Sequence, residues 1–277
     1  MKIYEDKICV ITGAASGIGR ALAISLAESG AQLALSDINA EGLSETVTMV
    51  GGANRVMSDV FDMADAKDVA DYAGKVESTL GKADYVFNVA GLTRVGQFVD
   101  TPLESMEKVM DVNFWGVVRM TKAFMDQILA TTGTVVNISS VFGLIGYAGQ
   151  THYCASKFAV RGFTETLAQE LKGTGVSVCC VHPGGVATNV ARNATIDKMP
   201  FEDVTREELD ANFDKMAITS PEKAAKIILK GAAKKKRRIL IGGDARYISI
   251  VSRLFPTSYT WLLEKYQGEN VVLGNRK

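Results

Sequence analysis

The sequence has few of the residues from which metal sites and disulfide frameworks are built. Its 277 residues include four cysteines and two histidines. Cys9, Cys154, Cys179 and Cys180 show neither CxxC spacing nor a set of histidine partners, so no zinc site is indicated. We therefore expect reduced thiols that pack as small hydrophobic side chains, and no metal.

The chain also lacks an excess of charge of either sign. Its 31 basic and 31 acidic side chains give a formal net charge of zero, which favours a small-molecule ligand over nucleic acid or an anionic membrane. One basic run, residues 234–238, follows a predicted helix at 222–233. Because cations complement the dipole at a helix C-terminus, we interpret this run as a solvated helix end and not as a nucleic-acid site.

Long hydrophobic runs are absent as well. No uninterrupted apolar stretch is long enough to span a bilayer, and Glu5, Asp6 and Lys7 stand where a secretion signal would need apolar residues. A cytoplasmic protein is therefore expected. No repeat, low-complexity tract or linker interrupts the sequence, so we predict a single domain over residues 1–277.

What the sequence does contain is a regular alternation of short apolar runs and amphipathic stretches. The runs are continuously apolar, as are strands of a parallel sheet covered on both faces. The alternation predicts an α/β fold: a doubly wound, seven-stranded parallel sheet with helices on both faces. The predicted strands are residues 8–11, 32–36, 55–58, 84–89, 134–138, 176–181 and 238–241, and the predicted helices include 18–29, 63–80, 102–130, 152–171 and 222–233.

A glycine-rich turn, TGAASGIG, joins the first predicted strand to the first predicted helix. Gly13 and Gly17 permit a tight turn and a close approach of backbone N–H groups to a pyrophosphate, and Gly19 lets the helix pack on the strand. The helix N-terminus also attracts phosphate. Since the turn lies in a β-α-β unit, we predict a dinucleotide site here that includes Ser16 and Ile18.

Acidic residues stand at the ends of the second and third predicted strands. Asp37 lies about twenty residues past the glycine turn, where a carboxylate can bind the adenosine ribose hydroxyls and would repel a 2′-phosphate. Ile38 and Ser16 offer no cation for that phosphate, so NAD is preferred and NADP stays possible. Asp59 and Val60 are candidates to contact the adenine. An aspartate in an ordinary surface turn is the alternative for Asp37.

Tyr153 and Lys157 lie four residues apart in the predicted helix 152–171, so their side chains rise from one face. A neighbouring ammonium favours the phenolate and is expected to lower the tyrosine pKa from about 10. Ser140 follows the buried strand 134–138, where its hydroxyl can point from the sheet edge beside the tyrosine. A surface pair without function is the alternative, but of the eight tyrosines only Tyr153 has a lysine four residues on.

Together these motifs resemble the short-chain dehydrogenase/reductase family, in its single-domain branch with a Rossmann fold. The similarity covers about residues 7–243, with the motifs in family order. One departure is Asn88-Val89, where the family usually has two asparagines. The resemblance implies roles for Asn88, Ala90 and Gly91 beside the cofactor, for Asn113 in holding a water of a proton relay to Lys157, and for Pro183, Gly184, Val186 and Thr188 along the nicotinamide.

The resemblance implies an NAD(P)-dependent oxidoreductase whose catalytic set is Asn113, Ser140, Tyr153 and Lys157. Tyr153 would exchange the alcohol proton while hydride moves to or from the nicotinamide, and Lys157 would also bind the nicotinamide ribose. Ser140 would donate a hydrogen bond to the substrate oxygen. Two alternatives stay open: a reductase of carrier-bound 3-oxoacyl groups, and a cofactor-sensing protein without catalysis.

The substrate pocket is predicted from the segments that flank the tyrosine in the fold. A lid of short helices is expected at about residues 186–216. Few fixed charges face the pocket, which favours an apolar secondary alcohol or ketone; Arg94 and Arg192 are interpreted as solvated and not as binders of an anionic tail. The candidate lining residues are Leu92, Thr93, Phe142, Leu144 and Tyr147.

Residues 244–277 match no motif of the family. Apolar residues at helical spacing on both sides of Pro256 predict two short amphipathic helices. We expect these to pack within the protein or an oligomer, and membrane contact is the less favoured alternative. Relatives commonly associate through the helices that correspond to 102–130 and 152–171, so the resemblance implies a homodimer or homotetramer.

Overall fold

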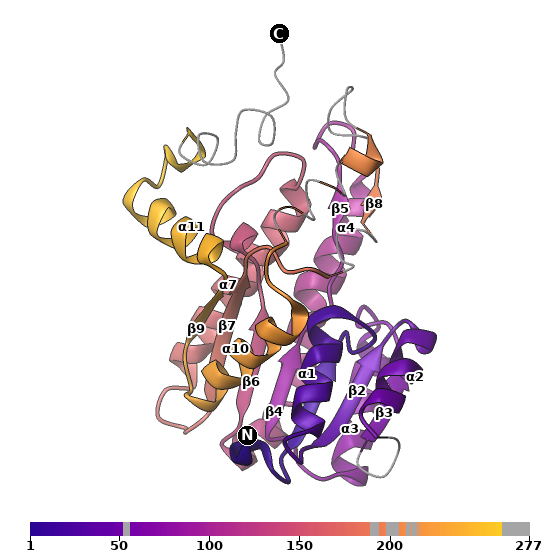
Figure 1. Ribbon diagram of the computed structural model, residues 1–277. Helices are drawn as coiled ribbons and strands as arrows, with labels where there is room; N and C mark the ends of the chain where they lie inside the picture. Colours follow the sequence, from indigo (N-terminus) through magenta and orange to yellow (C-terminus); the bar gives the residue numbers. More distant parts are fainter. Residues whose placement is uncertain are drawn as a thin grey trace.

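The computed structural model describes residues 1–51, 56–188, 194–197, 205–208, 211, 215 and 217–261. Seven parallel strands form one sheet in the order β3-β2-β1-β4-β6-β7-β9, with helices on both faces (Figure 1). The predicted doubly wound α/β fold is therefore confirmed. The strands are β1 (Ile8–Thr12), β2 (Gln32–Asp37), β3 (Val56–Val60), β4 (Tyr85–Asn88), β6 (Thr134–Ile138), β7 (Ser177–Pro183) and β9 (Arg238–Ile241).

The strand order reverses between β1 and β4. From β1 the chain adds β2 and β3 on one side, and from β4 it adds β6, β7 and β9 on the other. In an open parallel sheet, ligands bind beyond the carboxyl ends of the strands at this reversal. The segments that leave β1 and β4 there are the glycine turn and residues 89–91, so the topology brings two predicted cofactor segments together.

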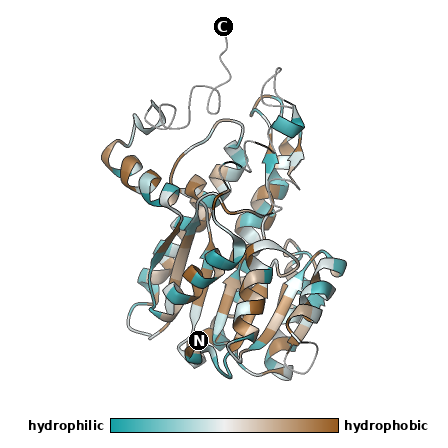
Figure 2. Ribbon diagram, viewed as in Figure 1, coloured by the Kyte–Doolittle hydropathy of each residue, from teal (hydrophilic) through white to brown (hydrophobic). Residues whose placement is uncertain are grey.

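Each face of the sheet has its own hydrophobic core, because successive strand residues point to opposite faces. In β4, Phe87 enters the core with α1, α2 and α10, and Val86 enters the core with α3, α5, α6 and α7. Figure 2 shows hydrophobic colour along the strands and on the inner sides of the helices. The helices are α1 (Gly17–Ala27), α2 (Ala40–Met49), α3 (Ala66–Thr79), α4 (Leu103–Met110), α5 (Gly116–Ala123), α6 (Met125–Thr131), α7 (Thr151–Glu170), α10 (Pro221–Ala233) and α11 (Gly243–Leu254).

The single helix predicted over residues 102–130 is wrong in one respect. The structure divides it into α4, a π-helical segment at Asp111–Trp115, α5 and α6. A π-helical turn changes the hydrogen-bond spacing from four residues to five and turns the following helix on its axis. The apolar periodicity runs through this turn almost unchanged, so the sequence alone did not predict it.

The chain above the sheet differs in part from the expectation. β8 (Thr195–Ile196) pairs with β5 (Arg94–Val95) in a small separate sheet that was not predicted. Most of the predicted lid at 186–216 lies outside the described residues. α11 ends before Pro256, as predicted, whereas 262–277, which hold most of the second predicted helix, lie outside the described residues. Within the described chain, no helix is both long and apolar enough to cross a membrane.

Candidate active site

The glycine turn is pressed against the segment that follows β4. Gly13 has a φ of +67° and Gly17 a φ of +53°, which side-chain-bearing residues seldom adopt. A Cβ on Gly13 would lie 2.7 Å from the Cα of Ala90, and one on Gly19 would lie 2.0 Å from the Gly13 carbonyl oxygen. The Ser16 side chain does not cap α1. The turn therefore presents bare backbone at a helix N-terminus, the arrangement that binds a pyrophosphate.

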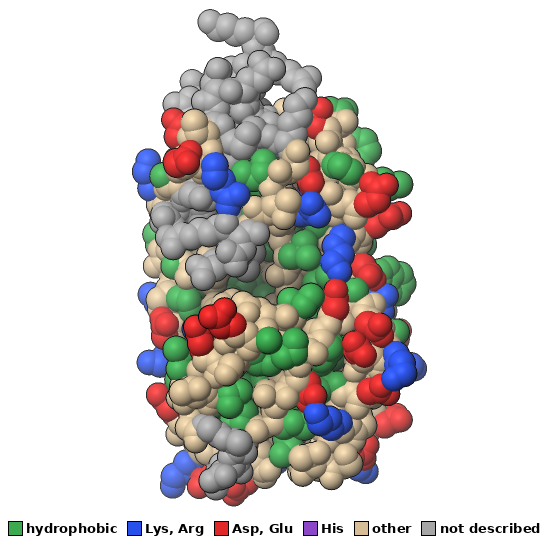
Figure 3. Space-filling view, turned by 90° about the vertical axis from the view of Figure 1, so that its right-hand side faces the viewer, with side chains coloured by type: hydrophobic (Ala, Val, Ile, Leu, Met, Phe, Trp, Pro, Cys, Tyr) green, Lys and Arg blue, Asp and Glu red, His purple; other side chains and the backbone are tan. Residues whose placement is uncertain are grey.

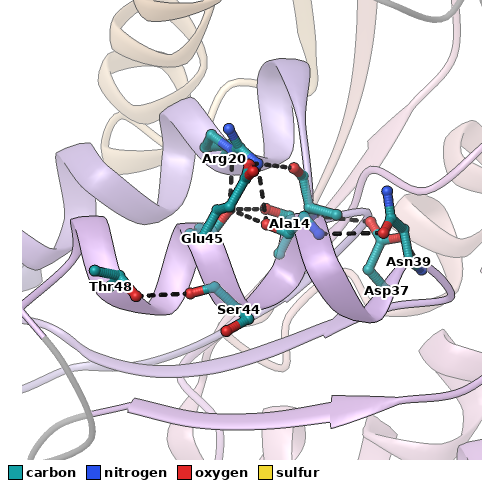
Figure 4. Close-up of polar contacts among 10 residues, drawn as sticks. Ala14, Arg20, Asp37, Asn39, Ser44, Glu45 and Thr48 are labelled. Carbon is teal, nitrogen blue, oxygen red and sulfur yellow. Dashed lines mark hydrogen bonds and ion pairs between the residues drawn. The ribbon is translucent and has the colours of Figure 1, made fainter.

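Asp37 is held beside this turn at the end of β2. Its Oδ2 accepts a hydrogen bond from Ala15 N at 2.9 Å and its Oδ1 accepts one from Asn39 N at 2.9 Å (Figure 4). Arg20 of α1 binds away from the carboxylate: its guanidinium donates to the Gly42 carbonyl at 3.0 Å and pairs with Glu45 at 2.7 Å. The nearby cation is thus engaged with α2.

At the end of β3, Asp59 and Val60 were predicted to contact the adenine, but Asp59 also has a partner within the protein. Asp59 forms an ion pair with Lys75 of α3, and its Oδ2 is buried with no hydrogen-bond partner in the described part of the chain. Ile38 and Val60 stay 67% and 54% exposed at the carboxyl ends of β2 and β3. Apolar side chains line a recess at mid-height on this side of the molecule (Figure 3). Such a recess suits the flat apolar faces of an adenine.

An amide ladder lies under the site and includes a residue that sequence reasoning missed. Asn88 Nδ2 donates to Asn137 Oδ1 at 2.8 Å and to Thr121 Oγ1 at 3.1 Å, and Asn137 Nδ2 donates to Thr164 Oγ1 at 3.0 Å. All four side chains are buried. The ladder ties β4 and β6 to α5 and α7. The available signal was an asparagine inside an apolar strand, since a buried amide needs partners.

Asn113 lies in the π-helical segment and is fully buried. Its Oδ1 accepts from Leu92 N at 2.9 Å, and its Nδ2 donates to Leu92 O at 2.9 Å and to Ser156 Oγ at 3.1 Å. A Cβ placed on Gly91 would lie 3.1 Å from Asn113 Oδ1 and 3.4 Å from Lys157 Nζ. Asn113, Gly91 and Lys157 therefore meet at one point, although they come from three different segments.

The other predicted catalytic side chains converge above the end of β6. Lys157 Nζ lies 5.5 Å from the ring centroid of Tyr153 and donates to Ile138 O at 3.1 Å. Ser140 Oγ accepts from Phe142 N at 3.1 Å, and the serine side chain also hydrogen-bonds Tyr153. The structure thus brings together all four residues of the predicted set, with Lys157 only 4% exposed.

The predicted lowering of the tyrosine pKa is wrong for this structure. Burial raises the pKa of Tyr153 to about 12, with the Ser140 hydrogen bond acting against it, and burial lowers the pKa of Lys157 to about 8. The ammonium faces the tyrosine ring, and desolvation disfavours both charged forms. The phenol is therefore protonated near neutral pH, which suits it to donate a proton.

Aromatic side chains surround the tyrosine. Phe142 meets the Tyr153 ring edge-on, with centroids 6.2 Å apart and planes at 88°, and it stacks on Tyr147 at 4.8 Å. Thr93 Oγ1 donates to Gln150 Oε1 at 2.9 Å, just before α7. Leu144 is placed differently from the other pocket candidates, because it is buried in a hydrophobic cluster with α11.

Arg94 is neither solvated nor free for an anionic ligand. Its guanidinium pairs with Asp197 at 3.0 Å, and Ser105 Oγ donates to the same carboxylate at 2.9 Å. Asp197 N also donates to Val95 O at 3.0 Å. This ion pair neutralises the charge and joins the described part of the predicted lid to α4. Arg192 lies outside the described residues.

His182 is a second residue that sequence reasoning passed over. It lies on β7, is fully buried, and has its Nδ1 3.0 Å from Ser140 O. Because a carbonyl only accepts, Nδ1 carries the proton and donates. Burial lowers the pKa of His182 to about 4. A neutral imidazole thus fixes the main chain of Ser140.

The loop after β7 crosses back to the glycine turn. Gly185 N donates to Asp244 Oδ2 at 2.7 Å, and a Cβ on Gly184 would lie 2.0 Å from that same oxygen. At the far end of the loop, the Thr188 methyl would lie 3.1 Å from a Cβ on Gly17. The predicted nicotinamide segment and the predicted phosphate turn are therefore in contact. Asp244, at the start of α11, was not singled out from the sequence.

Comparison with known proteins agrees with this architecture. The profile of the short chain dehydrogenase family matches residues 7–199. The putative oxidoreductase SadH of Mycobacterium tuberculosis is 43% identical over 267 residues, which cover 95% of this chain and 96% of the relative. The 3-oxoacyl-acyl-carrier-protein reductase FabG of Thermotoga maritima is 35% identical over 227 residues, covering 81% of this chain and 89% of the relative.

Among solved structures, a short-chain dehydrogenase/reductase of Burkholderia phymatum in complex with NAD superposes with a TM-score of 0.81 at 25% identity, covering 98% of this chain and 99% of the other. The fold and these similarities define a nicotinamide-dependent oxidoreductase. The chain belongs to the short-chain dehydrogenase/reductase family.

The close approach at Gly13 gives a first prediction. Gly13→Ala should cost more than about 2 kcal/mol of unfolding free energy, because a positive φ and a backbone clash act together, and it should weaken NADH binding. Gly74→Ala is the matched control: no atom lies within 4 Å of its Cβ position in α3, so a gain of about 0.5–1 kcal/mol is expected. Urea unfolding and NADH fluorescence titration measure both, and equal stabilities would contradict the assigned packing.

His182 should make the fold sensitive to acid. The unfolded chain binds a proton at this histidine below about pH 6.5, whereas the folded chain resists protonation until pH is about 4. Stability is therefore complete above the unfolded pKa and falls as pH drops toward the folded one. Between about pH 7 and pH 4.5, His182→Gln should lose roughly 2–3 kcal/mol less than the wild type. Parallel urea unfolding curves at both pH values test this; equal losses would show that His182 titrates normally.

Proposed function

We propose that the protein transfers hydride between NAD and an apolar secondary alcohol or ketone, with Tyr153 as the acid and base. The observation that carries the proposal is the environment of Tyr153: its hydroxyl is hydrogen-bonded to Ser140, Lys157 Nζ lies 5.5 Å from its ring centroid, and the Phe142 ring meets it edge-on. Tyr153 can donate a proton, Ser140 can donate a second hydrogen bond, and Phe142 provides an apolar wall. This combination suits the reduction of an apolar ketone to an alcohol.

The chain's own residues divide the work of that reaction. The nicotinamide cofactor, when bound, supplies or accepts the hydride. In reduction Tyr153 gives its proton to the substrate oxygen and becomes a phenolate; in oxidation, the reverse step, the phenolate accepts the proton of the alcohol. Ser140 donates to the same oxygen, a hydrogen bond that strengthens as negative charge develops. Lys157, whose pKa of about 8 keeps it mostly protonated at neutral pH, offers its charge to the cofactor ribose and the tyrosine.

Proton resupply is assigned to Asn113. The side chain sits between Leu92 and Lys157 and spans the gap from α7 to the segment after β4. Both N–H donors of its amide are used by Leu92 O and Ser156 Oγ, which fixes the orientation of the side chain, while Oδ1 accepts one hydrogen bond from Leu92 N and can accept a second. An amide held in this way can position a water next to the lysine, in line with the role that the family resemblance implies.

For the cofactor, the charge around the ribose end favours NAD. The Asp37 carboxylate is fixed by Ala15 N and Asn39 N, next to the turn where the adenosine ribose would lie. A 2′-phosphate would meet that negative charge, and Arg20 is already paired with Glu45. The chain would hold the pyrophosphate on the glycine turn and the nicotinamide along the loop after β7.

The substrate proposal rests on the neutrality of the pocket wall. Phe142, Tyr147 and Leu92 are apolar, and the arginine of this region is paired with Asp197. A carrier-bound acyl substrate, on which the FabG relative acts by name, brings a phosphate-bearing arm that calls for a cationic entrance. No unpaired cation is present at this wall within the described residues 92–105 and 140–153, so that alternative is second.

We also propose that the chain works as one domain and as a homodimer or homotetramer. Trp115, between α4 and α5, and Phe158, on α7, are 50% and 41% exposed although both are large and apolar. Phe114 packs against Trp115, with ring centroids 5.0 Å apart, and meets Phe163 of α7 edge to face at 6.4 Å. These helices correspond to the surfaces expected from the resemblance. Light scattering of the purified protein measures the assembly directly.

Replacement of Tyr153 by phenylalanine tests the central assignment. Tyr153→Phe should lower turnover by at least about 100-fold, since a positioned acid and base contributes that much, and NADH binding should stay nearly intact. Tyr147→Phe is the control, because it also removes one phenol from the wall but keeps the stacked ring. The assay follows nicotinamide absorbance over a panel of apolar and of CoA-linked alcohols and ketones. Wild-type turnover in Tyr153→Phe, or activity on CoA-linked compounds alone, would contradict the proposal.

Cofactor choice is tested at Asp37. Asp37→Asn keeps the shape of the side chain and removes its charge, so the preference for NADH over NADPH should fall by about tenfold or more, the effect of one charge-assisted hydrogen bond and a lost repulsion. Asp59→Asn, which removes a charge that already pairs with Lys75, serves as the control. Dissociation constants from fluorescence titration decide the matter, and a wild-type enzyme that prefers NADPH would overturn the choice.

A further inference from the structure

α11 has two faces, and its inner face packs on the loop that carries the proposed substrate wall. Ala245 and Ile248 are buried in one cluster with Val141, Leu144 and Ile145 from the loop after β6. The chain after α11 continues this contact, because Gly146 N donates to the Tyr259 hydroxyl at 2.9 Å. This face therefore makes the packing within the protein that the sequence led us to expect. A movement of α11 would also displace the loop between Ser140 and Tyr153.

The outer face of α11 carries large apolar side chains that nothing described covers. Ile250 and Leu254 are 58% and 67% exposed, and Phe255 just beyond the helix is 46% exposed. Positions 250 and 254 are one helical turn apart and lie on one face. In Figures 1 and 2, α11 stands clear of the sheet at one corner of the molecule, beyond the carboxyl end of β9.

The same outer face is positively charged. Arg246 and Arg253 are both exposed on it. Arg246 lies one helical turn before Ile250, and Arg253 is adjacent to Leu254 in the sequence. Residues 245–261 contain no aspartate or glutamate. Arg253 lies close enough to Arg238 to lower its pKa. Arg238 and Arg161 share a single partner, Glu165. The surface at this corner therefore has more arginines than carboxylates.

We propose that α11 docks the protein on an anionic lipid surface, with Ile250, Leu254 and Phe255 entering the headgroup boundary and Arg246 and Arg253 binding lipid phosphates. Arginine beside leucine, isoleucine and phenylalanine on a helix is the composition of an interfacial helix. Each arginine near an anionic surface contributes favourably, and the apolar side chains leave water. This surface was the less favoured alternative from the sequence, in which the two faces of the helix could not be distinguished.

A second copy of the chain fits this face less well. A two-fold contact places the same patch on both sides, so Arg246 and Arg253 of each copy would face their counterparts. Residues 245–261 contain no carboxylate that could pair with these four guanidinium groups across such a contact. Lipid phosphates supply the missing negative charge.

The position of α11 relates the proposed docking to the proposed function, although the docking does not depend on that function. The inner face holds the loop of Phe142 and Tyr147, so the proposed pocket lies close to the docking helix. An apolar substrate dissolved in the lipid would then reach the pocket over a short path. Binding to vesicles, in contrast, is measurable whether or not the enzyme turns over any compound.

Flotation with vesicles tests the docking. Full-length protein is mixed with vesicles of phosphatidylcholine alone, or of equal parts phosphatidylcholine and phosphatidylglycerol, and centrifuged through a density gradient. We expect flotation with the anionic vesicles and little with the neutral ones. Arg246→Gln/Arg253→Gln and Ile250→Ser/Leu254→Ser should each lower vesicle affinity by about tenfold or more.

Matched controls keep the result specific. Lys234→Gln/Lys236→Gln removes two exposed charges from the opposite end of β9, and Met49→Ser removes an exposed apolar side chain from the end of α2; both should float like the wild type. The proposal is overturned by wild-type protein that stays at the bottom with anionic vesicles, or by a lysine variant that loses as much affinity as the arginine variant. It is also overturned if light scattering shows that Ile250→Ser/Leu254→Ser lowers the oligomeric state, because the face then belongs to a second copy.

Discussion

Burial of one ammonium beside one phenol is the constraint on which the rest of the site depends. Lys157 is 4% exposed, and its Nζ donates to the carbonyl of Ile138. Because Ile138 is the last residue of β6, this hydrogen bond ties the end of the strand to α7. Removing such a pair from water disfavours both charges. The neighbours are closely arranged around it: a Cβ on Gly91 would crowd Asn113 Oδ1 at 3.1 Å, and Asn113 is held by hydrogen bonds to Leu92 and Ser156. A site of this kind is kept by its chemistry, since well-packed apolar side chains would be more stable there.

The loops that surround this pair are fixed from two sides of the sheet. His182 of β7 holds the carbonyl of Ser140, and Asp244 of α11 holds the N–H of Gly185. Neither residue is placed to touch the reacting atoms in the proposed reaction, yet each sets the main chain from which a proposed contact is made. Catalytic groups need positions fixed to within a fraction of an ångström. Buried hydrogen bonds from a side chain to the main chain fix the loops in this way and leave the site open.

The sequence predicted the sheet, its parallel strands, most of the helices and the proximity of Ser140, Tyr153 and Lys157. These features leave local signals: apolar runs, helical spacing and glycines at a strand end. The place of Asn113 was implied only by the family resemblance. The sequence predicted the wrong direction for the tyrosine pKa, because residue spacing indicates proximity but not burial, and burial raised the pKa. Asn137, His182 and Asp244 were missed for a related reason, because their partners lie in segments distant along the chain. The π-helical turn around Asn113 left no mark on the apolar periodicity.

The residues proposed to carry the reaction and the residues that support the surrounding loops lie in different parts of the chain. The family profile ends at residue 199 and already contains the glycine turn and the proposed catalytic set. The residues that support the loops after β6 and β7, namely Tyr259, Ile248 and Asp244, come after it. A chain can therefore keep the reaction and change its substrate by altering α11 and the residues beyond it. Because the inner face of α11 packs on the loop after β6, a substitution in α11 would act through this helix on the proposed substrate wall.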